Sequence, residues 1–123
     1  MEEMIRPGIR LTLEKEERFF GPGVAKLLEL VGEKGSIQGA CSEMGMSYSK
    51  SWKIIKRAER EFGYPLLRSH NGGTSGGKSE LTEEGKHVLR CYREMEQILR
   101  KKMDEVFEEY FPQTCGARGS LLQ

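Results

Sequence analysis

The stretch that decides the fold runs from residue 35 to residue 63 and reads GSIQGACSEMGMSYSKSWKIIKRAEREFG. Ser36 and Ser47 each stand where a helix N-cap is preferred, and Gly45 stands where a left-handed turn is preferred. The second of the two expected helices stops at Gly63, a usual helix-ending residue. These residues therefore predict two helices joined by a tight glycine turn.

The second expected helix has an apolar side and a cationic side. At 100° per residue, the apolar side collects Ser51, Trp52, Ile54, Ile55, Ala58 and Phe62, and the opposite side collects Lys53, Lys56, Arg57 and Arg60. Residues 47–79 carry seven Lys and Arg and two acidic residues, a local net charge of +5. Residues 1–46 and residues 83–109 each carry six Lys and Arg and eight acidic residues, a net charge of −2. A basic middle between acidic ends is typical of a phosphate-binding surface, so double-stranded DNA is the expected ligand.

The composition limits the class of protein. A chain of 123 residues with a net charge of +1, 37% hydrophobic and 32% charged residues, suits one helix-rich domain. No apolar run approaches the roughly 20 residues of a membrane span, and the acidic N-terminus is unlike a signal peptide. Three cysteines without a CxxC pair fit a reducing compartment. We therefore expect a cytoplasmic protein that does not bind membranes.

The elements on both sides of the helix pair complete a winged helix-turn-helix. Residues 9–13 alternate apolar and polar side chains, which predicts a short strand, and residues 24–33 have helical apolar spacing. Residues 66–69 and 79–81 predict a β hairpin with the glycine-rich segment 71–78 at its tip, which is the wing. The expected fold is mainly α with a small β hairpin.

A long helix is predicted to follow, from Thr82 as N-cap to about residue 110. Its apolar stripe consists of Val88, Tyr92, Met95, Leu99, Met103, Val106 and Tyr110. A stripe of this length either folds back along its own domain or pairs with the same helix of a second chain, and the second arrangement is the expected one. We therefore divide the chain into a DNA-binding domain (1–81), a dimerisation helix (82–110) and a disordered tail (111–123).

The candidate DNA contacts lie on the helix pair and the wing. A helix that enters the major groove presents its first turns to base edges and phosphates, and glycines in a wing bring its backbone close to DNA. The predicted contacts are Ser36, Ser47, Tyr48, Ser49, Lys50, Lys53, Lys56, Arg57, Arg68, Gly72, Gly73 and Lys78. Ser47 has the alternative role of a cap alone, and Tyr48 that of a core residue. Trp52 and Cys41 are expected in the core.

Catalytic and metal chemistry are not expected. Gly77-Lys78-Ser79 is expected to lead into a strand, whereas the G-K-[ST] of a P-loop opens a helix, and no carboxylate pair or Ser/His/Asp set is present. His87 and Cys91 are four residues apart and could hold a metal or respond to oxidation, but the sequence offers no third ligand. We therefore expect no enzyme activity, no cofactor and no metal.

Several short motifs resemble one family in order. They are Gly35-Ser36-Ile37, Gly45-Met46-Ser47-Tyr48, Ser51-Trp52, Pro65-Leu66, Gly72-Gly73, Gly76-Gly77 and Leu81-Thr82-x-x-Gly85. Over about residues 9–110 the chain resembles the N-terminal DNA-binding domain of ModE-type molybdate-responsive regulators and, more distantly, the LysR-type helix-turn-helix. The resemblance implies a homodimer held together by the long helix.

The resemblance also leads to an expectation about sensing. ModE-type regulators carry C-terminal molybdate-binding domains, whereas this sequence ends about a dozen residues after the long helix, so no small-molecule effector is expected on this chain. The expected function is a homodimeric, sequence-specific DNA-binding transcription regulator without a molybdate-binding domain of its own. The alternatives are a protein-interaction module on a winged-helix scaffold and a metal- or redox-responsive regulator.

Overall fold

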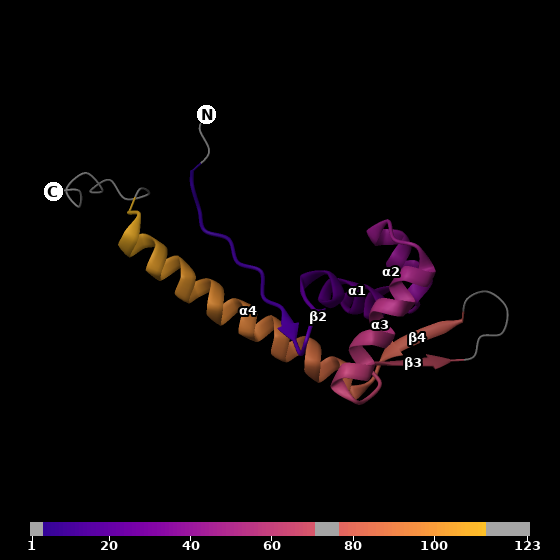
Figure 1. The fold of residues 1–123 in the computed structure, drawn as a ribbon. Coiled ribbons are helices and arrows are strands. Elements are labelled where there is room, and N and C mark those ends of the chain that lie inside the picture. Colours follow the sequence, from indigo (N-terminus) through magenta and orange to yellow (C-terminus); the bar gives the residue numbers. More distant parts are fainter. Residues whose placement is uncertain (1–3, 71–76, 113–123) are drawn as a thin grey trace. The chain divides into compact units, whose positions relative to one another are not determined.

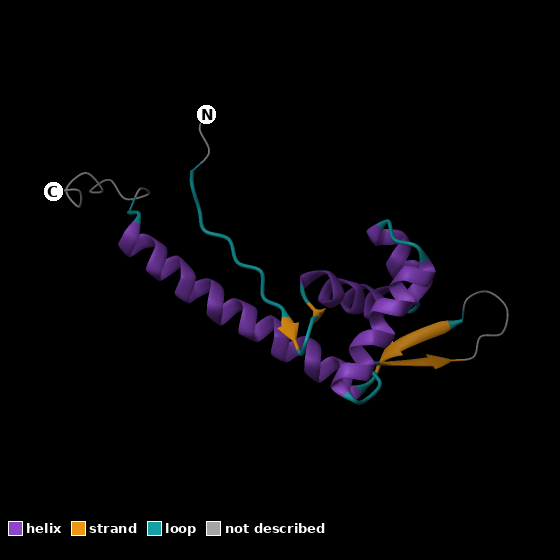
Figure 2. Cartoon of the chain, in the orientation of Figure 1, coloured by secondary structure: helices purple, strands orange, loops and turns teal. Residues whose placement is uncertain are grey.

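The computed structural model describes residues 4–70 and 77–112, and its helices and strands are shown in Figures 1 and 2. Arg10–Tyr92 form one compact unit, called here the winged domain. The described residues before and after it form a second unit. Some predictions lie outside the described residues: most of the wing tip (71–76), the DNA contacts by Gly72 and Gly73, and the disorder of the tail from residue 113 on.

Three helices with glycine ends form the framework of the winged domain. They are α1 (Pro22–Lys34), α2 (Ile37–Met44) and α3 (Tyr48–Phe62). Each is followed by a glycine in the left-handed conformation, with φ of 80°, 70° and 90° in turn, a backbone geometry that glycine adopts without strain. The predicted helix pair with its tight glycine turn is therefore confirmed.

The predicted N-terminal strand begins later in the chain than expected and is part of a hairpin that was not predicted. β1 (Leu13–Glu14) pairs with antiparallel β2 (Arg18–Phe20), and residues 9–12 belong to no strand. The alternation correctly identified two apolar side chains that face the core, Leu11 and Leu13, whereas Ile9 is exposed. A strand also needs a backbone partner, however, and β2 reaches only as far as Leu13.

The wing is an antiparallel pair of strands, β3 (Leu67–His70) and β4 (Lys78–Leu81). Its first strand is attached to α3 through Glu59, whose Oε2 accepts hydrogen bonds from the backbone N–H groups of Leu66 and Leu67 at 2.9 and 3.2 Å. Its second strand is attached to the end of α1, because the N–H of Ser79 donates to the carbonyl of Gly35 at 2.8 Å. The wing is thus fixed at its base to two helices.

The core of the winged domain lies between its three helices, the N-terminal hairpin and the first turns of α4 (Glu83–Tyr110). Aromatic rings connect these parts: the ring of Phe20 makes edge contacts with Phe62 and Tyr92, with centroids 5.8 and 5.1 Å apart. The Tyr92 hydroxyl donates a 2.7 Å hydrogen bond to the carbonyl of Leu11. Cys41 is buried, as predicted.

The start of α4 is attached to the wing by backbone contacts. Thr82 caps the helix as predicted, since its Oγ1 accepts from the Gly85 N–H at 2.9 Å and donates to the Pro65 carbonyl at 2.8 Å. Its own N–H donates to the Leu66 carbonyl at 2.9 Å. Among the described residues, no helix, including the 28 residues of α4, is long and apolar enough to cross a membrane.

Gly85 is the glycine whose replacement should be most harmful. A Cβ at this position would overlap the carbonyl oxygen of Leu66 and would lie 3.1 Å from the carbonyl carbon, both of which are backbone atoms that cannot turn aside. Gly85→Ala is therefore expected to lower the free energy of unfolding by about 1–3 kcal/mol, as overpacking does elsewhere. Urea denaturation of the wild type and the variant measures this difference in the free energy of unfolding. Gly23→Ala is the matched control, because a Cβ there has nothing within 4 Å, and an equal loss in both variants would contradict the explanation.

Candidate nucleic-acid interface

The N-terminal half of α3 presents polar and cationic side chains to solvent. Tyr48 is 43% exposed, so it is not a core residue, and Ser49, Lys50 and Lys53 are exposed as well. Ser47 is the N-cap: its Oγ accepts from the N–H of Lys50 at 3.2 Å. These five of the predicted DNA contacts therefore occupy accessible positions, and their contacts with DNA stay a prediction.

Two of the predicted cations of α3 are neutralised by acidic side chains. Lys56 Nζ lies 3.1 Å from an oxygen of Glu59. The Arg57 guanidinium lies 3.4 Å from Glu61 and 3.5 Å from Glu17, and its side chain is only 34% exposed. Both residues therefore have less charge to offer a phosphate than the sequence alone indicates.

The other cations of α3 are not paired with acidic side chains in the part of the chain that the structure describes. Within residues 4–70 and 77–112, no carboxylate forms an ion pair with Lys50, Lys53 or Arg60, and all three are exposed. Arg60 was not among the predicted contacts, although the sequence places it on the cationic side of the helix. These three side chains carry the positive charge most available to an anion.

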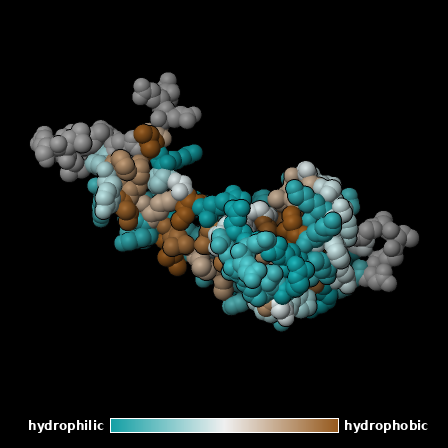
Figure 3. All heavy atoms as spheres, viewed as in Figure 1, coloured by the Kyte–Doolittle hydropathy of each residue, from teal (hydrophilic) through white to brown (hydrophobic). Residues whose placement is uncertain are grey.

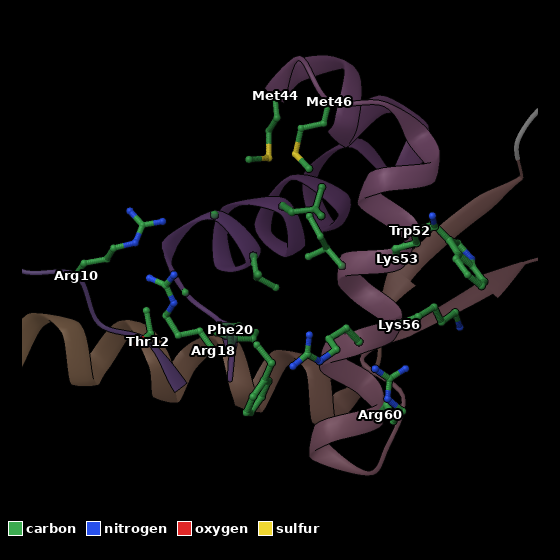
Figure 4. A pocket seen from close by; sticks show the side chains of 17 residues that line it. Arg10, Thr12, Arg18, Phe20, Met44, Met46, Trp52, Lys53, Lys56 and Arg60 are labelled. Atoms are coloured by element: carbon green, nitrogen blue, oxygen red, sulfur yellow. The ribbon is translucent and has the colours of Figure 1, made fainter. Parts of the chain in front are cut away.

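Trp52 is exposed rather than buried, so its assignment to the core was wrong. The buried residues of α3 are Ser51, Ile55 and Ala58, which are four and three residues apart, and Trp52 is one position beyond that stripe. Its ring is 45% exposed on the side of α3 that faces the wing strands, with Lys56 Nζ 5.5 Å from its centroid (Figure 4). Trp52 thus joins the accessible surface, which the strict spacing of the buried stripe could have predicted.

Ser36 is used as a helix cap. Its Oγ accepts a hydrogen bond from the Gly39 N–H at 2.9 Å at the start of α2, and the residue is half-buried. The hydroxyl proton remains available as a donor, because the cap uses only the oxygen lone pair. The predicted contact between Ser36 and DNA stays a prediction.

The strands of the wing carry basic side chains, one of which, Arg68, is paired with an acidic residue. Arg68 and Lys78 are exposed as expected, but Arg68 Nη1 lies 3.0 Å from Glu80 Oε2, and His70 Nε2 lies 2.8 Å from the same oxygen. The hydrogen bonds from His70 and then from Arg68 lower the pKa of the Glu80 carboxyl below its usual range. Glu80 is therefore ionised at neutral pH and competes with DNA for Arg68.

Replacement of Glu80 by glutamine should strengthen DNA binding. The variant removes the negative charge beside Arg68 and His70, so one more cation can displace a counterion from a phosphate. In a plot of log K against log salt, the slope should steepen by about 0.9. Fluorescence anisotropy with a labelled duplex measures this, and Glu84→Gln, an exposed change on α4, is the control. Unchanged or weaker binding would show that Arg68 does not face DNA.

The predicted stripe of α4 divides into a buried part and an exposed part. Val88 and Tyr92 are 6% and 1% exposed and belong to the core of the winged domain. Met95, Leu99, Val106 and Tyr110 are exposed, Met103 is half-buried, and Ile98 and Phe111 add exposed apolar surface that was not predicted. Figure 3 shows hydrophobic atoms along α4. The surface available to a partner therefore starts at Met95.

His87 and Cys91, the two residues considered for metal binding or oxidation, lie on the first turns of α4. Cys91 Sγ is 3.5 Å from His87 Nε2. In the described part of the chain, no group of three His, Cys, Asp or Glu side chains could hold a metal ion. The pair does not contribute to the interface described above.

Comparisons with known proteins identify the class to which this fold and surface belong. Residues 25–86 match the model of the bacterial regulatory helix-turn-helix proteins of the LysR family. The chain belongs to this family of DNA-binding transcription regulators.

Curated relatives confirm the resemblance to ModE-type regulators. The chain is 32% identical over 78 residues to the molybdenum-pterin-binding protein MopA of Rhodobacter capsulatus, covering 63% of this chain and 29% of MopA. It is 30% identical over 91 residues to the molybdenum transport protein ModE of Azotobacter vinelandii, covering 74% of this chain and 34% of that protein. It is 29% identical over 118 residues to the transcriptional regulator ModE of Haemophilus influenzae, covering 92% and 46%. The chain thus spans less than half the length of these relatives.

Solved structures confirm the winged helix-turn-helix fold. The DNA-binding domain of CbnR, solved as a complex with DNA, has a TM-score of 0.56 at 20% identity and covers 72% of this chain and 95% of its own. ArgP from Mycobacterium tuberculosis has a TM-score of 0.52 at 23% identity and covers 72% of this chain and 31% of its own. At these identities the likeness concerns the fold alone.

Proposed function

We propose that the chain is a homodimeric, sequence-specific transcription regulator that inserts α3 into the major groove of double-stranded DNA. The observation that carries this proposal is the surface of α3, on which Lys50, Lys53 and Arg60 are exposed and have no carboxylate partner in the described part of the chain. A helix with an accessible, capped N-terminus and unneutralised cations can bind phosphates and base edges together.

Dimerisation through α4 is supported by its exposed apolar side chains. Met95, Leu99, Val106 and Tyr110 are four, seven and four residues apart, so they share one side of the helix. Between 37% and 73% of each side chain is accessible in the single chain. A second copy of the same helix would cover them, and two copies of α3 would then read the two half-sites of a palindrome.

Binding to duplex DNA as a function of salt tests the proposal. The wild-type protein should bind a labelled duplex with an affinity that falls linearly on a log–log plot, because lysines and arginines release counterions from phosphates. Lys53→Ala should reduce the magnitude of the slope by about 0.9. Lys26→Ala, which removes an exposed lysine from α1, is the control and should leave the slope unchanged. Absence of duplex binding, or equal behaviour of the two variants, would reject α3 as the DNA surface.

A further inference from the structure

A hollow in the winged domain brings together cations from distant parts of the sequence. It has a volume of about 740 Å³ and lies between the N-terminal segment, α1 and α3 (Figure 4). Its floor is apolar and includes Val24, Leu27 and Ile54. Its cationic side chains are Arg10, Arg18, Lys53, Lys56, Arg57 and Arg60.

The hollow favours anions because its charges have one sign. Its lining contains six cationic side chains and no carboxylate, and among the described residues only Lys56 and Arg57 of the six are paired with acidic residues from outside the lining. Arg10 and Arg18 are exposed, and within residues 4–70 and 77–112 neither forms an ion pair. They precede the basic middle of the sequence, in a region with a net negative charge, so counting charges along the chain does not reveal them. The fold alone places them in the same hollow as Lys53.

The position of this arginine pair complements that of the wing. In Figure 4, Arg10 and Arg18 lie on one side of α3 and the wing strands lie on the other. A helix in the major groove, which is about 12 Å wide, has a phosphate backbone on each side. The wing can reach one of these backbones, and the second would run past the opposite side of α3. Arg10 and Arg18 are the cations that the structure places there.

We propose that Arg10 and Arg18 bind phosphates of the DNA backbone on the side of α3 away from the wing, an inference that rests on the proposed insertion of α3 into the major groove. The ligand is the phosphodiester of duplex DNA rather than a free phosphate, since the hollow is open and is continuous with the cations of α3. The segment from Arg10 to Arg18 is thus a DNA-binding element. Each winged domain then contacts the phosphate backbones of both DNA strands that border its major groove.

Salt-dependent binding of the full chain tests this inference. The probe is a fluorescein-labelled, mixed-sequence duplex of about 30 base pairs, roughly three helical turns. Arg10→Ala and Arg18→Ala should each lower the magnitude of the log–log salt slope by about 0.9, and the double variant should lower it by about twice that. Arg18→Lys, which keeps the charge, should retain the wild-type slope. Because both arginines are exposed and unpaired among the described residues, thermal unfolding should not change.

The controls separate failure of this inference from failure of the proposed function. Lys26→Ala should have the same salt slope as the wild type, and Lys53→Ala should reduce the magnitude of the slope. If Lys53→Ala reduces it but the arginine variants do not, α3 binds DNA and the inference is wrong. If wild-type protein does not bind the duplex, both fail. Titration with inorganic phosphate should give no saturable heat; saturable heat that Arg18→Ala removes, with an unchanged DNA slope, would identify a free-phosphate site and overturn the inference.

Discussion

Leu99→Glu is expected to convert the protein from a dimer to a monomer. The proposed seam covers Leu99 with the same face of a second α4, and a carboxylate there would have to be buried without a partner or the dimer would have to open. A buried unpaired charge costs several kcal/mol, so the dimer dissociation constant should rise at least about 100-fold. Sedimentation equilibrium at several concentrations measures the dissociation constant directly.

Gln97→Glu is the matched control for this experiment. It introduces the same carboxylate two residues earlier on α4, at an exposed position roughly on the opposite side of the helix. This variant should remain dimeric. A wild-type monomer, or dissociation of both variants, would show that the face through Leu99 is not the seam.

The same substitution should separate two kinds of DNA binding. A dimer reads two half-sites, whereas a monomer has only one recognition helix. Leu99→Glu should therefore lose its preference for a palindromic operator and keep a weak, salt-sensitive association with any duplex, because the cations of the winged domain are unaltered. Retention of wild-type operator affinity by a monomer would exclude the proposed mode of recognition.

Tyr92→Ala is expected to produce the largest loss of stability. Tyr92 is 1% exposed, its ring contacts Phe20, and its hydroxyl donates to the carbonyl of Leu11. Replacing a buried aromatic residue by alanine costs about 3–5 kcal/mol, which combines the lost burial with the cavity that remains. Urea denaturation followed by the fluorescence of Trp52, the single tryptophan, measures the free energy of unfolding.

Two further variants show how much of the stability lost in Tyr92→Ala comes from the buried ring. Tyr92→Phe removes only the hydroxyl and should cost about 1 kcal/mol. Tyr110→Ala removes a side chain that is 73% exposed and should leave the stability of the winged domain within about 0.5 kcal/mol of wild type. If Tyr92→Ala dissociates the dimer without destabilising the fold, Tyr92 lies in the seam after all.

Local signals explain why the fold could be predicted from the sequence. The caps at Ser36, Ser47 and Thr82 act within three residues along the chain, and each pairs with the expected backbone N–H group. The left-handed turn at Gly45 is likewise a property of that residue and its neighbours. Such features do not depend on distant parts of the chain, so the sequence pattern predicts them.

Some of the misassigned residues have surroundings that come from distant segments. The sequence gives one apolar stripe on α4, but packing against Phe20 and Leu11, more than 70 residues earlier, takes Tyr92 into the core. Arg57, which was predicted to bind phosphate, is paired with Glu61 on its own helix and also with Glu17, which the fold brings to within 3.5 Å of it. Periodicity indicates that a side chain lies on an apolar or a charged side of a helix, but partners from distant segments, such as Glu17, depend on the tertiary fold.

The link between Glu59 and the wing has a consequence for redesigning DNA specificity. Exchanging the exposed residues of α3 is an obvious route to a new operator, and Glu59 belongs to the same helix. Its carboxylate satisfies two amide groups at the start of the wing, at Leu66 and Leu67, so a transplanted helix with another residue at this position would leave both amides without their acceptor. A grafted helix should therefore keep glutamate at 59, and libraries of altered specificity should vary the exposed residues of α3 around it.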